Sequence, residues 1–203
     1  MKTSENEPRA SIAIDFMSDL SRVHRQVGVT TKDGHAISLE QGLADGISLM
    51  RHSCENGNKL IFIGNGGSAA IASHQAVDYW KNGGLEAIAF NDASLLTCIS
   101  NDFGYERVFA EPITCFARRG DVLLAISSSG QSRNILEGVQ ASRELECRVI
   151  TLSGFEETNP LRTMGDFNFY VPSRSYGIVE ISHLVLLHAM LEDIMHSRAA
   201  GKG

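Results

Sequence analysis

Five short apolar runs, separated by segments that favour helices, constrain the fold of this chain more than any other feature. They occupy residues 60–63, 86–90, 122–126, 148–152 and 167–171. A continuous apolar run of this length is typical of a strand that is buried on both faces, and strands that alternate with helices form parallel sheets. The pattern therefore predicts an α/β protein in which helices cover both faces of a parallel sheet. Ligands of such proteins bind beyond the carboxyl ends of the strands.

Two amphipathic segments precede these runs. The first spans about residues 12–23, and the second spans about residues 38–57, with Ser38 as the expected N-cap and Gln41 three residues later. Because no strand signal precedes residue 58, we expect a helical hairpin over residues 1–57 that is appended to an α/β core over residues 58–203. A chain of 203 residues is long enough for one domain with a core and short for two, so we expect a single domain.

Charge and hydropathy exclude several classes of partner. The formal net charge is −6 and there is no basic stripe, which argues against binding to nucleic acids or to an anionic membrane surface. No apolar stretch reaches the roughly 18 to 20 residues that span a bilayer, and the N-terminus lacks the pattern of a signal peptide. We therefore expect a cytoplasmic protein. The final segment, about residues 176–198, is apolar over most of a helix circumference, which predicts burial between subunits.

Two loops are candidates for holding an anion. The first, Gly64-Asn65-Gly66-Gly67-Ser68, follows a strand and opens a helix, so that its backbone N–H groups and the helix dipole favour a negative charge. The second, residues 127–132, places Ser127, Ser128, Ser129 and Ser132 around Gly130 at the end of another strand. Taken alone, the first loop is equally consistent with an ordinary tight turn, and a serine-rich turn such as the second is more commonly a helix cap. Two such loops at neighbouring strand ends favour a phosphate site.

Several polar residues carry the candidate chemistry. His74 and Asp78 are four residues apart, which places both on one face of the helix that starts at the first loop. Asp78 is alternatively an ordinary exposed residue of an amphipathic helix. Glu180, His183 and His188 interrupt the apolar final helix, where an unpaired polar group would be costly.

The two loops, taken with Asn91–Ser94, Asn101-Asp102-Phe103-Gly104-Tyr105-Glu106 and Gly120–Leu123, resemble the sugar isomerase (SIS) domain and, more narrowly, the phosphoheptose (sedoheptulose 7-phosphate) isomerases. The resemblance covers nearly the whole chain. It implies a three-layer sandwich with a five-stranded parallel sheet, a homotetramer, and active sites shared between subunits at their interfaces. The substrate-binding residues it implies are Asn65, Gly66, Gly67, Ser68, Asp102, Ser127, Ser128, Ser129, Ser132 and Glu180.

The same resemblance implies the catalytic and metal-binding residues. Asp78 stands where the family has its glutamate base, one methylene shorter, and His188 matches the catalytic histidine. Some members bind zinc through positions that correspond to His74, Asp78, Glu180 and His188, a set that suits zinc or another divalent metal. Glu180 and His188 lie about 12 Å apart along a regular helix, which makes their convergence on one ion demanding.

The resemblance also shows where this chain departs from the family. Glu180 replaces a glutamine, while Ile178 and Asn82 replace arginines. We expect an aldose–ketose isomerase that acts on sedoheptulose 7-phosphate, or on a closely related ketose phosphate, through an enediol, with Asp78 and His188 as acid and base. The alternative is a non-catalytic SIS-domain protein that binds a sugar phosphate or a replication initiator.

Overall fold

Five adjacent parallel strands form one side of a mixed sheet, up to its edge at β4, in the computed structural model, which describes residues 11–200. Their order is β7-β6-β5-β3-β4, and all four neighbouring pairs are parallel. Each strand lies within one of the five apolar runs or extends it by a single residue, so the predicted parallel sheet is confirmed. The strands are β3 (Leu60–Gly64), β4 (Ala87–Ala89), β5 (Val122–Ser127), β6 (Arg148–Ser153) and β7 (Phe167–Tyr170).

A short β-hairpin extends this sheet to seven strands. β1 (Gly28–Thr31) pairs antiparallel with β7 on one side and with β2 (Ala36–Ile37) on the other. The helices predicted before residue 58 are present as α1 (Ser11–His24) and α2 (Leu39–Glu55), but the expectation that no strand lies between them is wrong. Strands of four and two residues, with threonines in place of an apolar run, leave too weak a pattern to detect.

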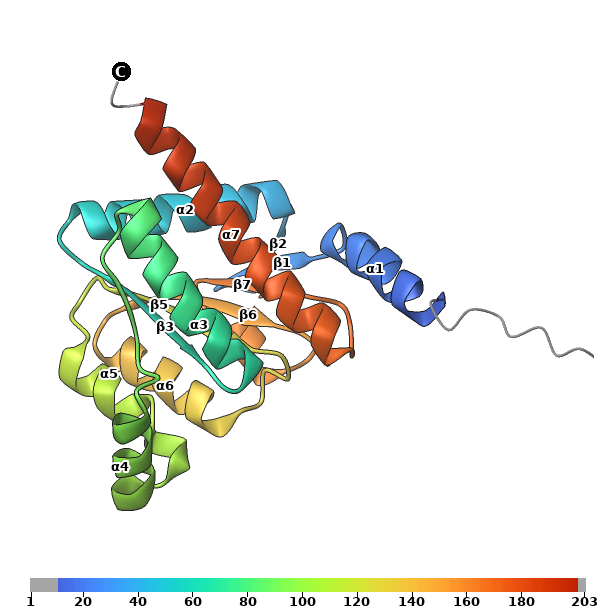
Figure 1. Cartoon of the computed structure of the whole chain (residues 1–203). Helices are drawn as coiled ribbons and strands as arrows, with labels where there is room; N and C mark the ends of the chain where they lie inside the picture. Colours follow the sequence, from blue (N-terminus) through green and yellow to red (C-terminus); the bar gives the residue numbers. More distant parts are fainter. Residues whose placement is uncertain (1–10, 201–203) are drawn as a thin grey trace, which may run out of the picture.

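Helices cover both faces of the sheet, which confirms the three-layer sandwich (Figure 1). Side chains of β3 and β5 alternate between two apolar clusters: Phe62 and Leu124 pack with α2, α3 and α7, whereas Ile63 and Leu123 pack with α5 and α6. The remaining helices are α3 (Gly67–Asp78), α4 (Ala93–Phe103), α5 (Ala110–Phe116), α6 (Arg133–Glu144) and α7 (Tyr176–Ala200). Among the described residues, no helix is both long enough and apolar enough to cross a membrane.

The helices α3 and α7 lie side by side over the sheet, and this packing positions most of the candidate side chains. α3 continues directly into a π-helical turn, η1 (Tyr79–Gly83). The buried Tyr79 hydroxyl donates to the carbonyl oxygen of Leu187 at 2.9 Å, which fastens the end of α3 to the middle of α7. The two helices that carry His74, Asp78 and His188 are therefore joined by both apolar packing and a buried hydrogen bond.

Candidate functional site

A cavity of about 220 Å³ lies where β3 and β5 end, and the first and second loops face each other across it. We call it the loop cavity. All but one of the predicted substrate-binding residues line it, and Ile126 and Tyr176 complete it. The sequence analysis did not identify Tyr176. Its position four residues before Glu180 puts both side chains on one helix face, and this spacing could have been used to predict its place in the cavity. The lining consists of Asn65, Gly66, Gly67, Ser68, Ile126, Ser127, Ser128, Ser129, Ser132, Tyr176 and Glu180.

Close packing explains why glycines occupy the first loop. A Cβ atom on Gly64 would lie 2.5 Å from the backbone oxygen of Ser68, and Gly66 has φ = +55°, a conformation that L side chains rarely adopt. Gly66 is also the N-cap of α3 and offers no side-chain acceptor. The N–H groups of Ala69 and Ala70 donate to the carbonyl oxygen of Gly66 at 3.0 and 3.1 Å, so it is the N–H groups of Gly67 and Ser68, at the very start of α3, that are left to a ligand in the loop cavity.

The second loop presents hydroxyl groups in the same way. Ser127 Oγ accepts the N–H of Gly130 at 3.2 Å and Ser129 Oγ accepts the N–H of Gln131 at 3.2 Å, so the loop is held by its own side chains. Ser128 Oγ is buried and has no hydrogen-bond partner among the described residues. An unpaired buried hydroxyl is costly by about 1–3 kcal/mol, which favours a polar ligand that restores the missing bond. Four serine hydroxyls and two helix N-termini together suit a phosphate.

Three of the candidate catalytic and metal-binding residues meet at the C-terminal half of α3. Nε2 of His74 lies 3.3 Å from Oδ2 of Asp78, and the rings of His74 and His188 make an edge-to-face contact at 5.3 Å between centroids. One ligand atom from each of His74, Asp78 and His188 lies within 4.8 Å of the others. We call this set the His–Asp–His cluster. Two imidazoles and a carboxylate so close together form a donor set that fits zinc or another divalent cation.

Glu180 lies apart from the His–Asp–His cluster and faces the first loop. A Cβ atom on Gly67 would lie 2.5 Å from Oε2 of Glu180, so the carboxylate rests directly on the loop backbone. Its eight-residue separation from His188 along α7 corresponds to about 12 Å, which explains why the two do not converge. The structure therefore divides the four predicted metal ligands into a group of three and a fourth that lines the loop cavity.

Asp102 is the one predicted substrate-binding residue that does not line the loop cavity of its own chain. It lies near the end of α4, which has no buried residue and extends away from α3 and α7 (Figure 1). Its carboxylate accepts a hydrogen bond from the side chain of Asn101 at 2.9 Å. Asp102 is exposed, so it is free to contact a ligand or another subunit.

His183 has a structural role. Its ring is fully buried, and its Nε2 lies 3.1 Å from the carbonyl oxygen of Ser153, which can only accept, so Nε2 carries the proton. Burial lowers the pKa of His183 to about 4, and the hydrogen bond offsets part of that effect. The imidazole is therefore neutral near pH 7 and ties α7 to the end of β6.

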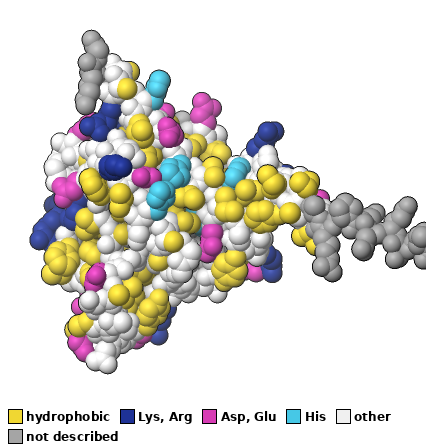
Figure 2. Space-filling view, in the orientation of Figure 1, with side chains coloured by type: hydrophobic (Ala, Val, Ile, Leu, Met, Phe, Trp, Pro, Cys, Tyr) yellow, Lys and Arg dark blue, Asp and Glu magenta, His cyan; other side chains and the backbone are white. Residues whose placement is uncertain are grey.

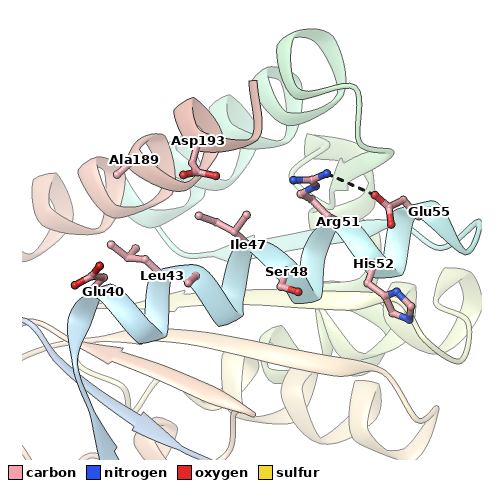
Figure 3. Close-up of a pocket in the computed structure, with 10 residues that line it drawn as sticks. Glu40, Leu43, Ile47, Ser48, Arg51, His52, Glu55, Ala189 and Asp193 are labelled. Atoms are coloured by element: carbon pink, nitrogen blue, oxygen red, sulfur yellow. Dashed lines mark ion pairs between the residues drawn. The ribbon is translucent and has the colours of Figure 1, made fainter. Parts of the chain in front are cut away.

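A second groove lies outside the candidate site. It has a volume of about 680 Å³ and lies between α2, which contributes Leu43 and Ile47, and α7, which contributes Ala189 (Figure 3). Arg51 and Glu55 form an ion pair of 3.9 Å at one end. None of the predicted catalytic or substrate-binding residues lines this groove.

Comparisons with known proteins agree with this geometry. The family model of the SIS domain matches residues 32–154. Phosphoheptose isomerase from Helicobacter hepaticus is 35% identical over 172 residues, which cover 82% of this chain and 87% of that protein. The corresponding protein from Geotalea daltonii is 34% identical over 188 residues, covering 90% and 96%. The solved structure of phosphoheptose isomerase from Neisseria gonorrhoeae superposes with a TM-score of 0.81 at 31% identity, covering 92% of this chain and 98% of that one.

Proposed function

This chain belongs to the SIS domain family and, within it, to the phosphoheptose isomerases. We propose that its substrate binds with the phosphate in the loop cavity and is isomerised at the His–Asp–His cluster. The protein is a phosphosugar isomerase that interconverts sedoheptulose 7-phosphate, or a closely related ketose phosphate, and the corresponding aldose phosphate. The alternative of a non-catalytic binding protein does not account for the His–Asp–His cluster, because phosphate binding alone needs no such group.

One observation carries the proposal: a single helix links the phosphate loop to the candidate acid and base. α3 begins at Gly67 in the first loop and reaches His74 and Asp78 after seven and eleven residues. At 1.5 Å per residue, these positions lie about 10 to 16 Å along the helix axis. A seven-carbon sugar that carries its phosphate on C7 reacts at C1 and C2, at the opposite end of the molecule. A site for this substrate needs such a separation between the phosphate donors and the reacting groups.

The proposed reaction is a proton transfer between C1 and C2. A base removes the C1 proton of the ketose, the C2 carbonyl oxygen becomes the second hydroxyl of an enediol, and return of a proton to C2 with loss of the O1 proton gives the aldose. We assign these transfers to Asp78 and His188, which lie together in the cluster. The side-chain amide of Asn82 donates to Oδ1 of Asp78 at 3.3 Å while His74 faces Oδ2, so both carboxylate oxygens are held.

The cluster would also hold a divalent metal through His74, Asp78 and His188, a donor set that suits zinc or another divalent cation. A cation there would polarise the sugar oxygens next to the reacting carbons. Glu180 is instead assigned to substrate contact, because it lines the loop cavity.

We further propose a homotetramer with active sites at subunit interfaces. Hydrophobic side chains gather along the exposed face of α1 (Figure 2), where Ile12, Ile14 and Met17 are 78%, 59% and 66% exposed. On α7, Ile181 and Val185 are also exposed. An apolar surface of this kind is typical of a protein–protein contact. We also place the protein in the cytoplasm, because a charged sugar phosphate does not cross a bilayer freely.

The test of function is a panel of ketose phosphates, with sedoheptulose 7-phosphate as the first. Purified protein is incubated with each compound, with and without a chelator, and aldose formation is followed by NMR. Formation of the heptose 7-phosphate supports the proposal. Absence of turnover with every ketose phosphate would show that the protein only binds its ligand, and turnover that is insensitive to the chelator would exclude a role for a metal.

A further inference from the structure

Two asparagine side chains join the loops on either side of the loop cavity. Asn65, in the first loop, donates through Nδ2 to Oδ1 of Asn134 at 2.8 Å. Asn134, in the first turn of α6, donates through Nδ2 to Oδ1 of Asn65, also at 2.8 Å. Asn134 is only 3% exposed, while Asn65 is half-buried and lines the loop cavity. A reciprocal amide pair constrains both the separation of the two loops and their relative orientation.

Two further donors leave the pair only one arrangement. The backbone N–H of Ile135 donates to Oδ1 of Asn134 at 3.0 Å, and the hydroxyl of Tyr105 lies 3.0 Å from Oδ1 of Asn65 as its donor. An amide oxygen accepts hydrogen bonds and an amide nitrogen only donates them. The N–H of Ile135 can only donate, so it fixes the orientation of the Asn134 amide, and the reciprocal pair then fixes that of Asn65. The Tyr105 hydroxyl, which can donate or accept, adapts to this arrangement by donating.

The Tyr105 hydroxyl brings a third segment into the network. Tyr105 opens the 3₁₀ turn η2 (Tyr105–Arg107), three residues beyond Asp102 at the end of α4. Neither α4 nor η2 contains a fully buried residue, and α4 packs against the core through the partly buried Leu95, Leu96 and Ile99. The hydrogen bond to Asn65 ties the segment that carries Asp102 to the first loop.

We propose that Asn134 is a positioning residue that acts through Asn65 and Tyr105 to hold both loops, and the end of α4, in the arrangement that receives one phosphate. This inference rests on the proposed function, because it assigns the loop cavity to the phosphate of the sugar. Both loops supply helix N-termini, and these reinforce each other only when they converge on the same anion. Loops that moved independently would have to be ordered at each binding event, which would weaken affinity.

Two variants test the network without adding charge. Asn134→Leu preserves the shape of the side chain but removes the pair, and the N–H of Ile135 keeps the carbonyl oxygen of Ser132 as its acceptor at 3.0 Å. Tyr105→Phe removes one hydroxyl from an exposed ring, which leaves folding unaffected. The control is Asn168→Leu, which removes another buried amide network, to Thr151 and Ser153 in the sheet, none of whose residues lines the loop cavity.

The affinity for inorganic phosphate and for sedoheptulose 7-phosphate is measured by calorimetry, together with Tm, kcat and KM. We expect Asn134→Leu to raise Kd and KM by about fivefold, and Tyr105→Phe by about twofold to threefold. The value of kcat stays within about twofold, because the phosphate is not a reacting group. Asn168→Leu lowers Tm and leaves both Kd values unchanged.

Unchanged phosphate affinity and KM in both network variants would overturn the inference, as would an equal loss of affinity in Asn168→Leu. Wild-type protein that binds phosphate but isomerises no ketose phosphate would refute the proposed function, and the phosphate affinities of the variants would then decide the positioning role on their own. Wild-type protein that binds neither probe would refute both.

Discussion

Nε2 of His74 lies 3.3 Å from Oδ2 of Asp78, one turn further along α3. The Asp78 side chain is 19% exposed and that of His74 is 55% exposed, so the carboxylate is sheltered while the imidazole remains open to solvent. This pair and His188 from α7 lie together at the C-terminal half of the helix that begins at the first loop, so the candidate acid and base, Asp78 and His188, are neighbours.

Substitution of Asp78 separates chemistry from binding. Asp78→Asn is expected to lower kcat by at least about a hundredfold, because the amide cannot accept the sugar proton. The Kd for sedoheptulose 7-phosphate changes little, because the loop cavity is intact. Asp78→Glu, which restores the length found in the family, is the matched variant and should retain activity. Near wild-type turnover by Asp78→Asn in an NMR assay would refute the assignment of Asp78.

The zinc affinities of three variants test the division of the predicted metal ligands. His74→Gln and His188→Gln are each expected to weaken zinc binding by at least about tenfold, because each removes a donor of the His–Asp–His cluster. Glu180→Gln should leave zinc affinity unchanged, because its side chain lies at the first loop. Calorimetric titration of the metal-free protein with zinc measures the affinity of all three variants. A large loss of zinc affinity in Glu180→Gln would show that Glu180 is a metal ligand after all.

The carboxylate of Glu180 is expected to repel phosphate. Two unit charges about 4 Å apart interact by about 1 kcal/mol in a high dielectric, so Glu180→Gln should tighten the binding of inorganic phosphate by about fivefold. The gain should shrink at high ionic strength, where the charges are screened. Phosphate affinities at low and high salt provide the measurement. Weaker binding by Glu180→Gln would instead mean that the carboxylate helps to hold the ligand.

The buried His183 should make stability depend on pH. Its pKa is lowered from 6.5 to about 4 in the folded protein, so the unfolded chain takes up a proton first as the pH falls. The stability that this neutral histidine contributes is present above about pH 6.5 and is lost between about pH 6.5 and 4, by about 3 kcal/mol. Below that window both states are protonated and the effect levels off.

His183→Gln removes this titration and retains a side-chain donor for Ser153. Its free energy of unfolding, from urea denaturation at several pH values, should fall less steeply than that of the wild type between pH 6.5 and 4. Parallel pH profiles for the two proteins would show that His183 is not the group responsible.

Local patterns predicted the parallel part of the sheet and both loops. The apolar runs that form β3 and β5 are fully buried, and a strand buried on both faces is recognised by a nearly continuous series of apolar residues. The N-cap Ser38 was equally local, and its hydroxyl accepts the N–H of Gln41 at 3.1 Å. The hairpin of β1 and β2 escaped detection because its pairing with β7, far along the chain, defines it more than its own residues do.

The sequence by itself determined the α/β architecture, the two loops and the family, because periodicity, glycine turns and motif order are written in consecutive residues. Only the tertiary structure decided which side chains meet. It set His188 against His74 and Asp78, moved Glu180 to the first loop, and paired Asn65 with Asn134. The physical reason is that these contacts depend on how α7 packs across α3 and how far apart β3 and β5 end, distances that arise from packing the whole core.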